Sequence, residues 1–384
     1  MVKGIYILVF AAALMSFDAS AWWEKRADFG SHGRHRGTGL SIGNKGYFGL
    51  GHYNGAGPNI VMSDWWEYDP ATNSWSQKAD YIGNNGNGNY GTIKMTIGKF
   101  GYLAGGTLGD QMLYKYDPAL NLWTPVVMCP IVPGNRAAFA IGDKGYYVSG
   151  SDVYEFDSVS ETWSTKSPAP FSTWAWNSAF VLNGKGYMKN GTSLYEYKAS
   201  IDSWTPRAAF PGLARSASVA LTHDGKGYIV AGYGAFGLSD VTSEVWEYDP
   251  SLNIWNFAGD FPGTSRRFAS GFNIGERAFI GIGTNGTNFN DFYEFNPYAS
   301  LDEKFDITEF STFPNPSNDH INFKSNNLNS YSIDVFDMMG RKIFTEESQN
   351  GEIRFDKGNN ESGTYIYHVK VDGALVHSNK FIFN

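Results

Sequence analysis

The chain has 384 residues, a formal net charge of -8 and a pI near 5.4. Nucleic acid and anionic membrane surfaces are bound through clustered Lys and Arg, so neither is expected as the main partner of this acidic chain. Its 45 glycines and its many Tyr, Phe and Trp residues favour short aromatic strands joined by tight turns, which predicts an all-β protein. The length suits one large domain and one small domain.

The N-terminal segment has the pattern of a secretory signal peptide. Lys3 precedes an apolar run over residues 5–15, which is too short to cross a bilayer, and Ala19-Ser20-Ala21 provides a cleavage site of small residues. We therefore predict a signal peptide over residues 1–21 and a mature chain that starts at Trp22. No other segment has the roughly 20 apolar residues of a membrane helix, so an exported protein without a transmembrane segment is expected. The single cysteine, Cys129, leaves no internal disulfide.

A repeated pattern follows the signal peptide. Each copy contains a strand that begins near one glycine and ends in another; the copies span residues 46–51, 101–106, 145–150, 186–191, 227–232 and 278–283, the last beginning with alanine. A strand centred on an aromatic residue comes next in each copy, at Tyr68, Tyr116, Phe156, Tyr197, Tyr248 and Phe295. Six units of about four short strands each have the length and content of β-propeller blades.

Tryptophans indicate how the ring of blades closes. They follow the first five of these aromatic residues at a constant interval, at Trp75, Trp123, Trp163, Trp204 and Trp255. The sixth copy has Asp302 at the corresponding position, whereas residues 23–29 closely parallel residues 75–81. The mature N-terminus is therefore predicted to supply the outer strand of the last blade, which would leave no blade without a neighbour.

This pattern of paired glycines with spaced tyrosine and tryptophan resembles the kelch repeat. The resemblance covers residues 22–297 and implies a six-bladed kelch β-propeller. The sequence departs from the family pattern mildly, since only Gly105-Gly106 is an adjacent glycine pair with both members of the motif, while other copies keep the second glycine alone.

The repeat stops near residue 298, and the acidic stretch over residues 298–312 is predicted to be a linker. Alternating strands over residues 313–384 then predict a small β-sandwich. Phe313-Pro314-Asn315-Pro316, a D-x-x-G-R motif over residues 337–341 and Gly363-Thr364-Tyr365 resemble the type A C-terminal sorting domain of the Bacteroidetes type IX (Por) secretion system. The resemblance implies export across the outer membrane, type IX machinery as a partner, and a secreted or surface-bound product.

A functional site is expected on the face where the loop entering each innermost strand meets the loop after the glycine strand. Loops over residues 51–67, 232–247 and 283–294 are long, whereas those over residues 150–155 and 191–196 are short, which predicts a wall formed by blades 5, 6 and 1 beside the channel. Candidate ligand-binding residues on this face are Arg36, Arg136, Arg215, Arg267, Tyr90, Trp174, Trp176, His35 and His52. Guanidinium groups bind carboxylates and aromatic rings stack on sugars, which suits an acidic glycan. The alternative is that these arginines bond to neighbouring carbonyls and the aromatic rings only pack.

Metal binding is the weaker interpretation of the polar loops. His32, His35 and His52 could approach one another and hold a metal ion, but histidine spacing on a glycine-rich loop is weak evidence. Residues 284–291 are rich in Asn and Gly and are more typical of turns than of a calcium site. No metal and no cofactor are expected.

Three functions remain open from the sequence. The first is a binding module for a glycan or a surface protein. The second is a carbohydrate-active kelch enzyme of the sialic acid epimerase or mutarotase type, for which Glu244 and Glu276 are the nearby carboxylates. The galactose oxidase type of kelch enzyme is disfavoured, since Cys129 is the only cysteine and no histidine lies between His223 and His320. The third is a structural surface adhesin.

Overall fold

The computed structural model describes residues 22–54, 59–234, 240–295, 310–326, 328, 330–337, 342–348, 350–371 and 374–384. The predicted signal peptide, most of the predicted linker, parts of the two longest loops and residues 338–341 of the D-x-x-G-R motif lie outside these residues. The chain divides into two compact units, Met1–Asn296 and Pro297–Asn384.

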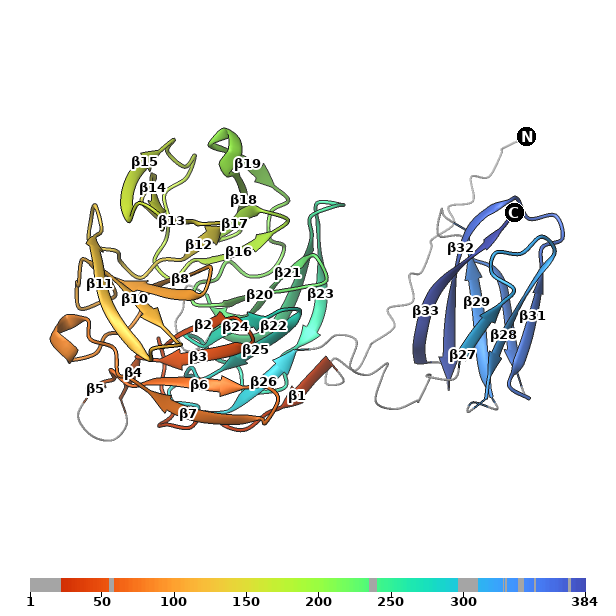
Figure 1. Ribbon diagram of the computed structural model, residues 1–384, viewed down its shortest axis with the longest axis horizontal. Coiled ribbons are helices and arrows are strands. Elements are labelled where there is room, and N and C mark those ends of the chain that lie inside the picture. Colours follow the sequence, from red (N-terminus) through yellow and green to blue (C-terminus); the bar gives the residue numbers. More distant parts are fainter. Residues whose placement is uncertain are drawn as a thin grey trace, which may run out of the picture. The chain divides into compact units, whose positions relative to one another are not determined.

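Within its described residues, the first unit contains six four-stranded antiparallel sheets (Figure 1). One sheet contains β2 (Thr38–Ile42), β3 (Lys45–Gly49), β6 (Trp65–Asp69) and β7 (Ser74–Lys78). The next contains β8 (Ile93–Ile97), β9 (Phe100–Ala104), β10 (Met112–Asp117) and β11 (Leu122–Met128). The third contains β12 (Ala138–Ile141), β13 (Lys144–Ser149), β14 (Asp152–Asp157) and β15 (Thr162–Lys166).

The other three sheets follow the same order of strands. They contain β16 (Ser178–Leu182), β17 (Lys185–Asn190), β18 (Ser193–Lys198) and β19 (Ser203–Arg207); then β20 (Val219–His223), β21 (Lys226–Tyr233), β22 (Val241–Asp249) and β23 (Ile254–Asp260). The last contains β24 (Ser270–Ile274), β25 (Arg277–Gly281), β26 (Phe292–Phe295) and β1 (Trp23–Lys25), in which β1 from the chain's N-terminal part pairs with β26. A small hairpin of β4 (His52–Tyr53) and β5 (Ile60–Val61) and two short 3-10 turns, Asn84–Gly86 and Ala199–Ile201, complete the described elements.

The first strands of the sheets lie together. They contact one another in chain order from β2 to β24, and β24 also contacts β2. The unit is therefore propeller-like, and residues from all six strands line a common channel.

The repeated glycine has a packing role at the contact between successive sheets. A Cβ atom added to Gly46 would lie 2.1 Å from the ring of Phe272, and one added to Gly186 would lie 2.3 Å from the ring of Phe139. Each glycine thus lets the aromatic ring of the preceding sheet press against its backbone, which explains why the sequence repeats a small residue there.

The hairpin between the third and fourth strands explains the constant tyrosine-to-tryptophan interval. In the first sheet, the Asn73 amide oxygen accepts hydrogen bonds from the Tyr68 hydroxyl (2.9 Å) and from the backbone N–H of Ala27 (2.9 Å), and Trp75 Nε1 donates to the Ala27 carbonyl (3.0 Å). Asn121 with Trp123 and Asn253 with Trp255 repeat these contacts with Ala79 and Ala208. The interval is fixed because the tyrosine bonds to the asparagine of its own hairpin, while that asparagine and the tryptophan both bond to one alanine backbone outside the hairpin.

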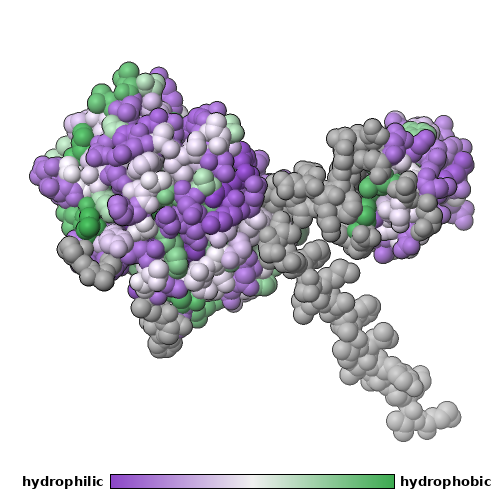
Figure 2. Space-filling model, turned by 90° about the horizontal axis from the view of Figure 1, so that it is seen from below, coloured by the Kyte–Doolittle hydropathy of each residue, from purple (hydrophilic) through white to green (hydrophobic). Residues whose placement is uncertain are grey.

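The surface of the first unit is mostly hydrophilic on the side seen in Figure 2. Large exposed apolar residues occur singly, among them Leu120, Val159, Ile201 and Leu252 at the tips of outer hairpins. Cys129 is buried and free, and burial raises the pKa of its thiol to about 12, so it is an inert core residue.

The second unit consists of two sheets. One contains β27 (Phe310–Phe313), β28 (His320–Ser325) and β31 (Glu352–Asp356), and the other contains β30 (Lys342–Ser348), β29 (Tyr331–Phe336), β32 (Gly363–Val371) and β33 (Ala374–Phe383). Alternate residues of these strands form one buried apolar core between the sheets, with Phe323, Ile333 and Phe381 fully buried. This is the arrangement of a β-sandwich.

Candidate functional site

A cavity of about 150 Å³ lies in the channel of the first unit, where the chain enters the first strands. All six sheets contribute to its wall, and the charged residues in that wall are Arg36, Lys94 and Arg136. No Asp or Glu of the described residues lines it. The cavity is therefore cationic, although the chain as a whole is acidic.

A second cavity, of about 270 Å³, continues along the same strands. The residues common to both cavities are Lys94, Ala138, Ala179, Ala220 and Gly271. These residues mark the level of the channel at which the two cavities meet, which we call the waist. The opposite end of the first cavity is the channel mouth.

Backbone hydrogen bonds join the sheets at the mouth. The N–H of Arg36 donates to the Phe268 carbonyl (3.0 Å), that of Phe268 to Ala217 (3.1 Å) and that of Ala217 to Trp176 (2.7 Å). Arg36, Trp176, Ala217 and Phe268 have φ angles of 58°, 62°, 52° and 55°, in the left-handed region that costs a non-glycine residue about 1 kcal/mol or more. The strained conformation recurs at equivalent positions of four sheets, and at three of them, Arg36, Trp176 and Phe268, the side chain at the mouth is large.

Two loops meet at the mouth, as the repeat predicted. Isolated backbone bridges join His35 to His52, Ser216 to Tyr233 and Arg267 to Thr284, each linking the loop that enters a first strand with the loop after a glycine strand. The remainder of the two longest loops, residues 55–58 and 235–239, lies outside the described residues, so the predicted wall of blades 5, 6 and 1 stays a prediction.

Aromatic rings hold the guanidinium groups at the mouth. Arg36 lies 4.2 Å from the ring of Phe268, 5.4 Å from that of Trp176 and 5.8 Å from that of Tyr90. Arg267 lies 4.9 Å from the ring of Tyr233. Burial, and after it the nearby charge of Arg267, lowers the pKa of Arg36. The guanidinium groups are thus stacked in fixed positions without leaving their charged state.

These arginines have unused hydrogen-bonding capacity. Nε of Arg36, Arg136 and Arg267 is buried and has no hydrogen-bond partner within the described part of the chain. None of the three forms an ion pair with a described carboxylate, whereas a guanidinium can donate five hydrogen bonds. The positive charge of these three guanidinium groups is therefore not compensated by any described carboxylate.

Comparison with known proteins identifies the second unit. Residues 311–384 match the family model of the secretion system C-terminal sorting domain. This tail is a type IX sorting domain. It indicates export through the type IX system to the cell surface or beyond it.

The first unit is similar in structure to YjhT, a kelch-type propeller. The solved structure of YjhT is 14% identical to this chain, and the alignment covers 70% of this chain and 96% of YjhT with a TM-score of 0.58. Such a low identity shows the propeller-like fold alone. No curated protein matches the sequence, and within the described residues no helix is long and apolar enough to span a membrane.

The motifs of the sorting domain are built into its sandwich. The side chain of Asn315, in the Phe-Pro-Asn-Pro segment, accepts a hydrogen bond from the N–H of Ile382 in the last strand (3.0 Å). Tyr365, which begins β32 with Gly363, is buried and stacks on Phe381 with ring centroids 5.5 Å apart. The first motif thus fastens the C-terminal strand, and the last one fills the core.

The structure separates the arginines that the sequence grouped together. Arg36 and Arg136 line the cavity, whereas Arg215 is 2% exposed, forms an ion pair with Glu244 and donates to the Ala231 carbonyl (3.4 Å). Its guanidinium is therefore already occupied, and we assign Arg215 to the fold and not to ligand binding.

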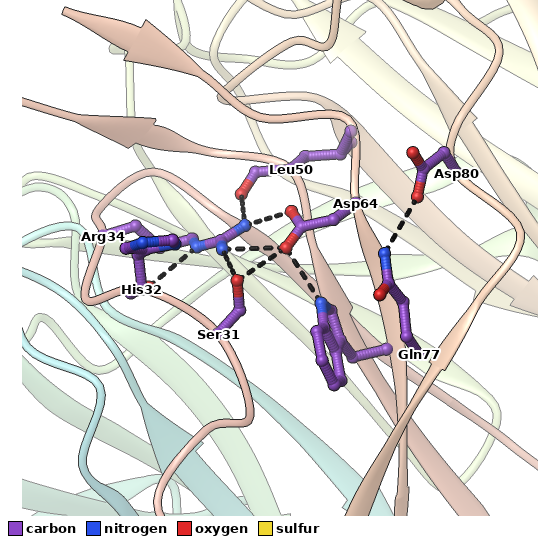
Figure 3. A network of polar contacts seen from close by, with 8 residues as sticks. Ser31, His32, Arg34, Leu50, Asp64, Gln77 and Asp80 are labelled. Atoms are coloured by element: carbon purple, nitrogen blue, oxygen red, sulfur yellow. Dashed lines mark hydrogen bonds and ion pairs between the residues drawn. The ribbon is translucent and has the colours of Figure 1, made fainter.

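Arg215 belongs to a set of three equivalent ion pairs in which the arginine is buried. In the first sheet, Arg34 pairs with Asp64 and donates to the Leu50 carbonyl (3.0 Å), while Ser31 and Trp66 also donate to Asp64 (Figure 3). In the last sheet, Arg266 pairs with Asp291 and donates to the Ile282 carbonyl (3.0 Å). Each arginine ties the segment that enters a first strand to the end of the second strand and the start of the third strand of the same sheet, or to residues next to them.

The predicted aromatic residues differ in position. Trp176 lines the cavity, and Tyr90 lies between Arg36 and His52, whose ring is stacked on it at 5.1 Å. Trp174 is 53% exposed and does not line the cavity. Phe268, Tyr233 and Lys94 were not predicted from the sequence. An alignment of the segments that enter the first strands, in which Phe268 corresponds to Arg36, would have indicated Phe268.

His35 and His52 form a neutral pair beside the mouth. Their ring centroids are 5.0 Å apart, and Nε2 of His35 lies 2.9 Å from the Asn54 amide oxygen. Burial lowers the pKa of His35 to about 4 and also lowers that of His52. His32 is exposed, and the described residues contain no group of three His, Cys, Asp or Glu side chains placed to hold a metal.

The carboxylates considered for catalysis lie elsewhere. Glu244 bonds to Arg215 and Trp246, and Glu276 accepts a hydrogen bond from the backbone N–H of Asp224 (2.7 Å). Neither lines the channel cavities. Within residues 284–291, the Thr284 hydroxyl accepts from the N–H of Gly286 (2.9 Å) and Asn285 accepts from Thr287 (3.2 Å), so these side chains form turns.

The buried His35 should make the first unit sensitive to acid. The unfolded chain takes up a proton on this residue near the ordinary pKa of about 6.5, while the folded chain does so only near 4. Unfolding therefore becomes easier as the pH falls from about 6.5 to 4, by up to about 3 kcal/mol.

A His35→Gln variant should lose this part of the pH dependence. The measurement is urea unfolding at pH 7 and pH 4, followed by tryptophan fluorescence. His32→Gln, which changes an exposed ring, is the control and should retain the wild-type difference. Equal pH dependence in wild type and His35→Gln would contradict the assignment.

Proposed function

We propose that this protein is an exported binding module, in which a six-bladed kelch-type propeller over residues 22–297 presents its channel mouth to an anionic ligand. The likeness to YjhT supports the kelch assignment. The six four-stranded sheets, the contact of β24 with β2 and the pairing of β1 with β26 support a ring of six blades that the N-terminal strand closes. Signal cleavage before Trp22 would free that strand to pair.

The proposed ligand class rests on the uncompensated positive charge at the channel mouth. Arg36 and Arg136 line the cavity, and Arg267 lies outside the lining but next to the Phe268 ring that Arg36 also faces. None of these three guanidinium groups has a carboxylate partner among the described residues, and the cavity wall contains no described Asp or Glu. Elsewhere in the same unit, buried arginines such as Arg34 and Arg266 are paired with acids. An anionic ligand would supply the negative charge that these guanidinium groups lack.

The aromatic residues at the mouth indicate that the anionic group of the ligand belongs to a sugar. Trp176 and Tyr233 border the same guanidinium groups and are rings of the kind that stack on sugars, whereas Tyr90 is already covered by Arg36 and His52. A cavity of about 150 Å³ suits one small group and not a folded protein segment. We therefore propose the carboxylate-bearing residue of an acidic glycan as the ligand.

The test is binding to a glycan array that contains uronic acid and sialic acid glycans together with their neutral counterparts. The protein should bind the acidic members, and Arg36→Met or Arg267→Met should weaken binding roughly 10-fold to 100-fold, because a charged hydrogen bond contributes about 1.5–3 kcal/mol. Binding should also weaken with added salt.

Lys99→Met is the matched control. It removes one positive charge from the turn between β8 and β9, away from the cavity lining, and should leave binding unchanged. Equal binding of acidic and neutral glycans, or full binding by Arg36→Met, would refute the proposed site.

A further inference from the structure

Lys94 is the one long side chain at the waist of the channel. The other residues shared by the two cavities are alanines and a glycine. Lys94 projects from β8, and its ammonium group donates to the carbonyls of Gly39 in β2 and of Gly271 in β24 (2.9 Å for the latter). The side chain thus reaches across one sheet to the next and lies between both cavities.

The ammonium group has no counter-ion. Among the described residues, no carboxylate forms an ion pair with Lys94. An ammonium carries three N–H donors, of which the two carbonyls take two. A partly buried cation without a counter-ion is unfavourable, so a lysine in this position either gives up its proton or binds an anion.

We propose that the waist is an anion site, in which Lys94 donates its third hydrogen bond to a small carboxylate or a comparable monovalent anion that enters through the channel. The surrounding glycine and alanine residues leave the space that such an anion needs. This site goes beyond the proposed glycan site at the mouth, because it requires neither the aromatic rings nor Arg36.

Lys189 provides a matched comparison within the same unit. It is 2% exposed, donates to the Arg215 carbonyl (3.1 Å) and forms no ion pair with a described carboxylate, but it lines neither cavity. Burial lowers the pKa of Lys94 to about 8 and that of Lys189 to about 7. The two lysines therefore share a lowered pKa and the lack of a described carboxylate partner, and they differ in access to the channel.

The experiment follows the lysine side chains of the full chain by NMR after labelling at Cε, with Lys94→Met and Lys189→Met to assign the two signals. Acetate is the probe and acetamide its neutral counterpart, at fixed ionic strength. Acetate should raise the pKa of Lys94 in a saturable manner by about one unit or more, since an opposite charge at this range favours the ammonium form. Acetamide should not, and Lys189 should respond to neither.

Two outcomes would overturn the waist site. If acetate raises the pKa of Lys94 and of Lys189 by the same amount, the change is a general ion effect and not binding at the waist. If Arg36→Met abolishes the response of Lys94, the anion is held at the mouth. The glycan test is separate: loss of glycan binding in Arg36→Met with no response of Lys94 to acetate would support the mouth and refute the waist.

Discussion

Replacing Trp23 with Ala should lower the free energy of unfolding of the first unit by about 3–5 kcal/mol, the usual cost of removing a buried large aromatic side chain. Trp23 is 8% exposed and packs against Phe295 and Phe261, with ring centroids 4.6 and 5.1 Å away. It also anchors β1 beside β26, where Trp23 pairs with Phe295. Loss of the side chain would weaken the strand on which the proposed ring closure depends and expose the edge of β26.

Urea unfolding followed by tryptophan fluorescence measures this effect. All 12 tryptophans lie within residues 22–255, so the signal reports on the first unit alone. Trp174→Ala is the control, because Trp174 is 53% exposed and its loss should change stability by no more than about 0.5 kcal/mol. If the two variants were equally stable, β1 would contribute little and the proposed closure would be wrong.

The strands could be predicted because the pattern that specifies them is local and repeated. Tyr68, Asn73 and Trp75 lie within one hairpin, and the contacts that fix their spacing recur in other sheets. The parallel between residues 23–29 and 75–81 predicted a partner for the last sheet in the same way, since Ala27 and Ala79 make equivalent bonds. The sorting domain was also predictable, because its motifs occur in order along one short segment.

The site was less predictable because it depends on distances between sheets. Lys94 occupies an ordinary polar position in an alternating strand. Nothing near it in the sequence indicates that its ammonium group reaches the carbonyls of Gly39 and Gly271. Arg215 resembles Arg136 in its local sequence, yet a carboxylate 29 positions further along the chain occupies its guanidinium. Whether an arginine is paired with an acid or has no acidic partner therefore depends on residues that are distant in the sequence.

Arg266 and Arg267 are neighbours in the sequence, but only Arg266 is paired with an acid. Replacing Arg266 with Met should lower the free energy of unfolding by about 3–5 kcal/mol. Arg266 is fully buried, pairs with Asp291 and donates to the Thr264 carbonyl (2.9 Å) and the Ile282 carbonyl (3.0 Å). Its removal would leave the Asp291 carboxylate mostly buried without a compensating charge, which is the expensive way to break a buried pair.

A double variant separates the charge from the packing. Arg266→Met combined with Asp291→Asn should recover part of the loss, because the second change removes the unpaired carboxylate, and urea unfolding of the four proteins gives the coupling energy. Arg267→Met should behave in the opposite way, with stability within about 0.5 kcal/mol of wild type and weakened binding of acidic glycans. Equal destabilisation by Arg266→Met and Arg267→Met would mean that both arginines serve the fold, and the mouth would then lack one of the three cations on which the proposed ligand class depends.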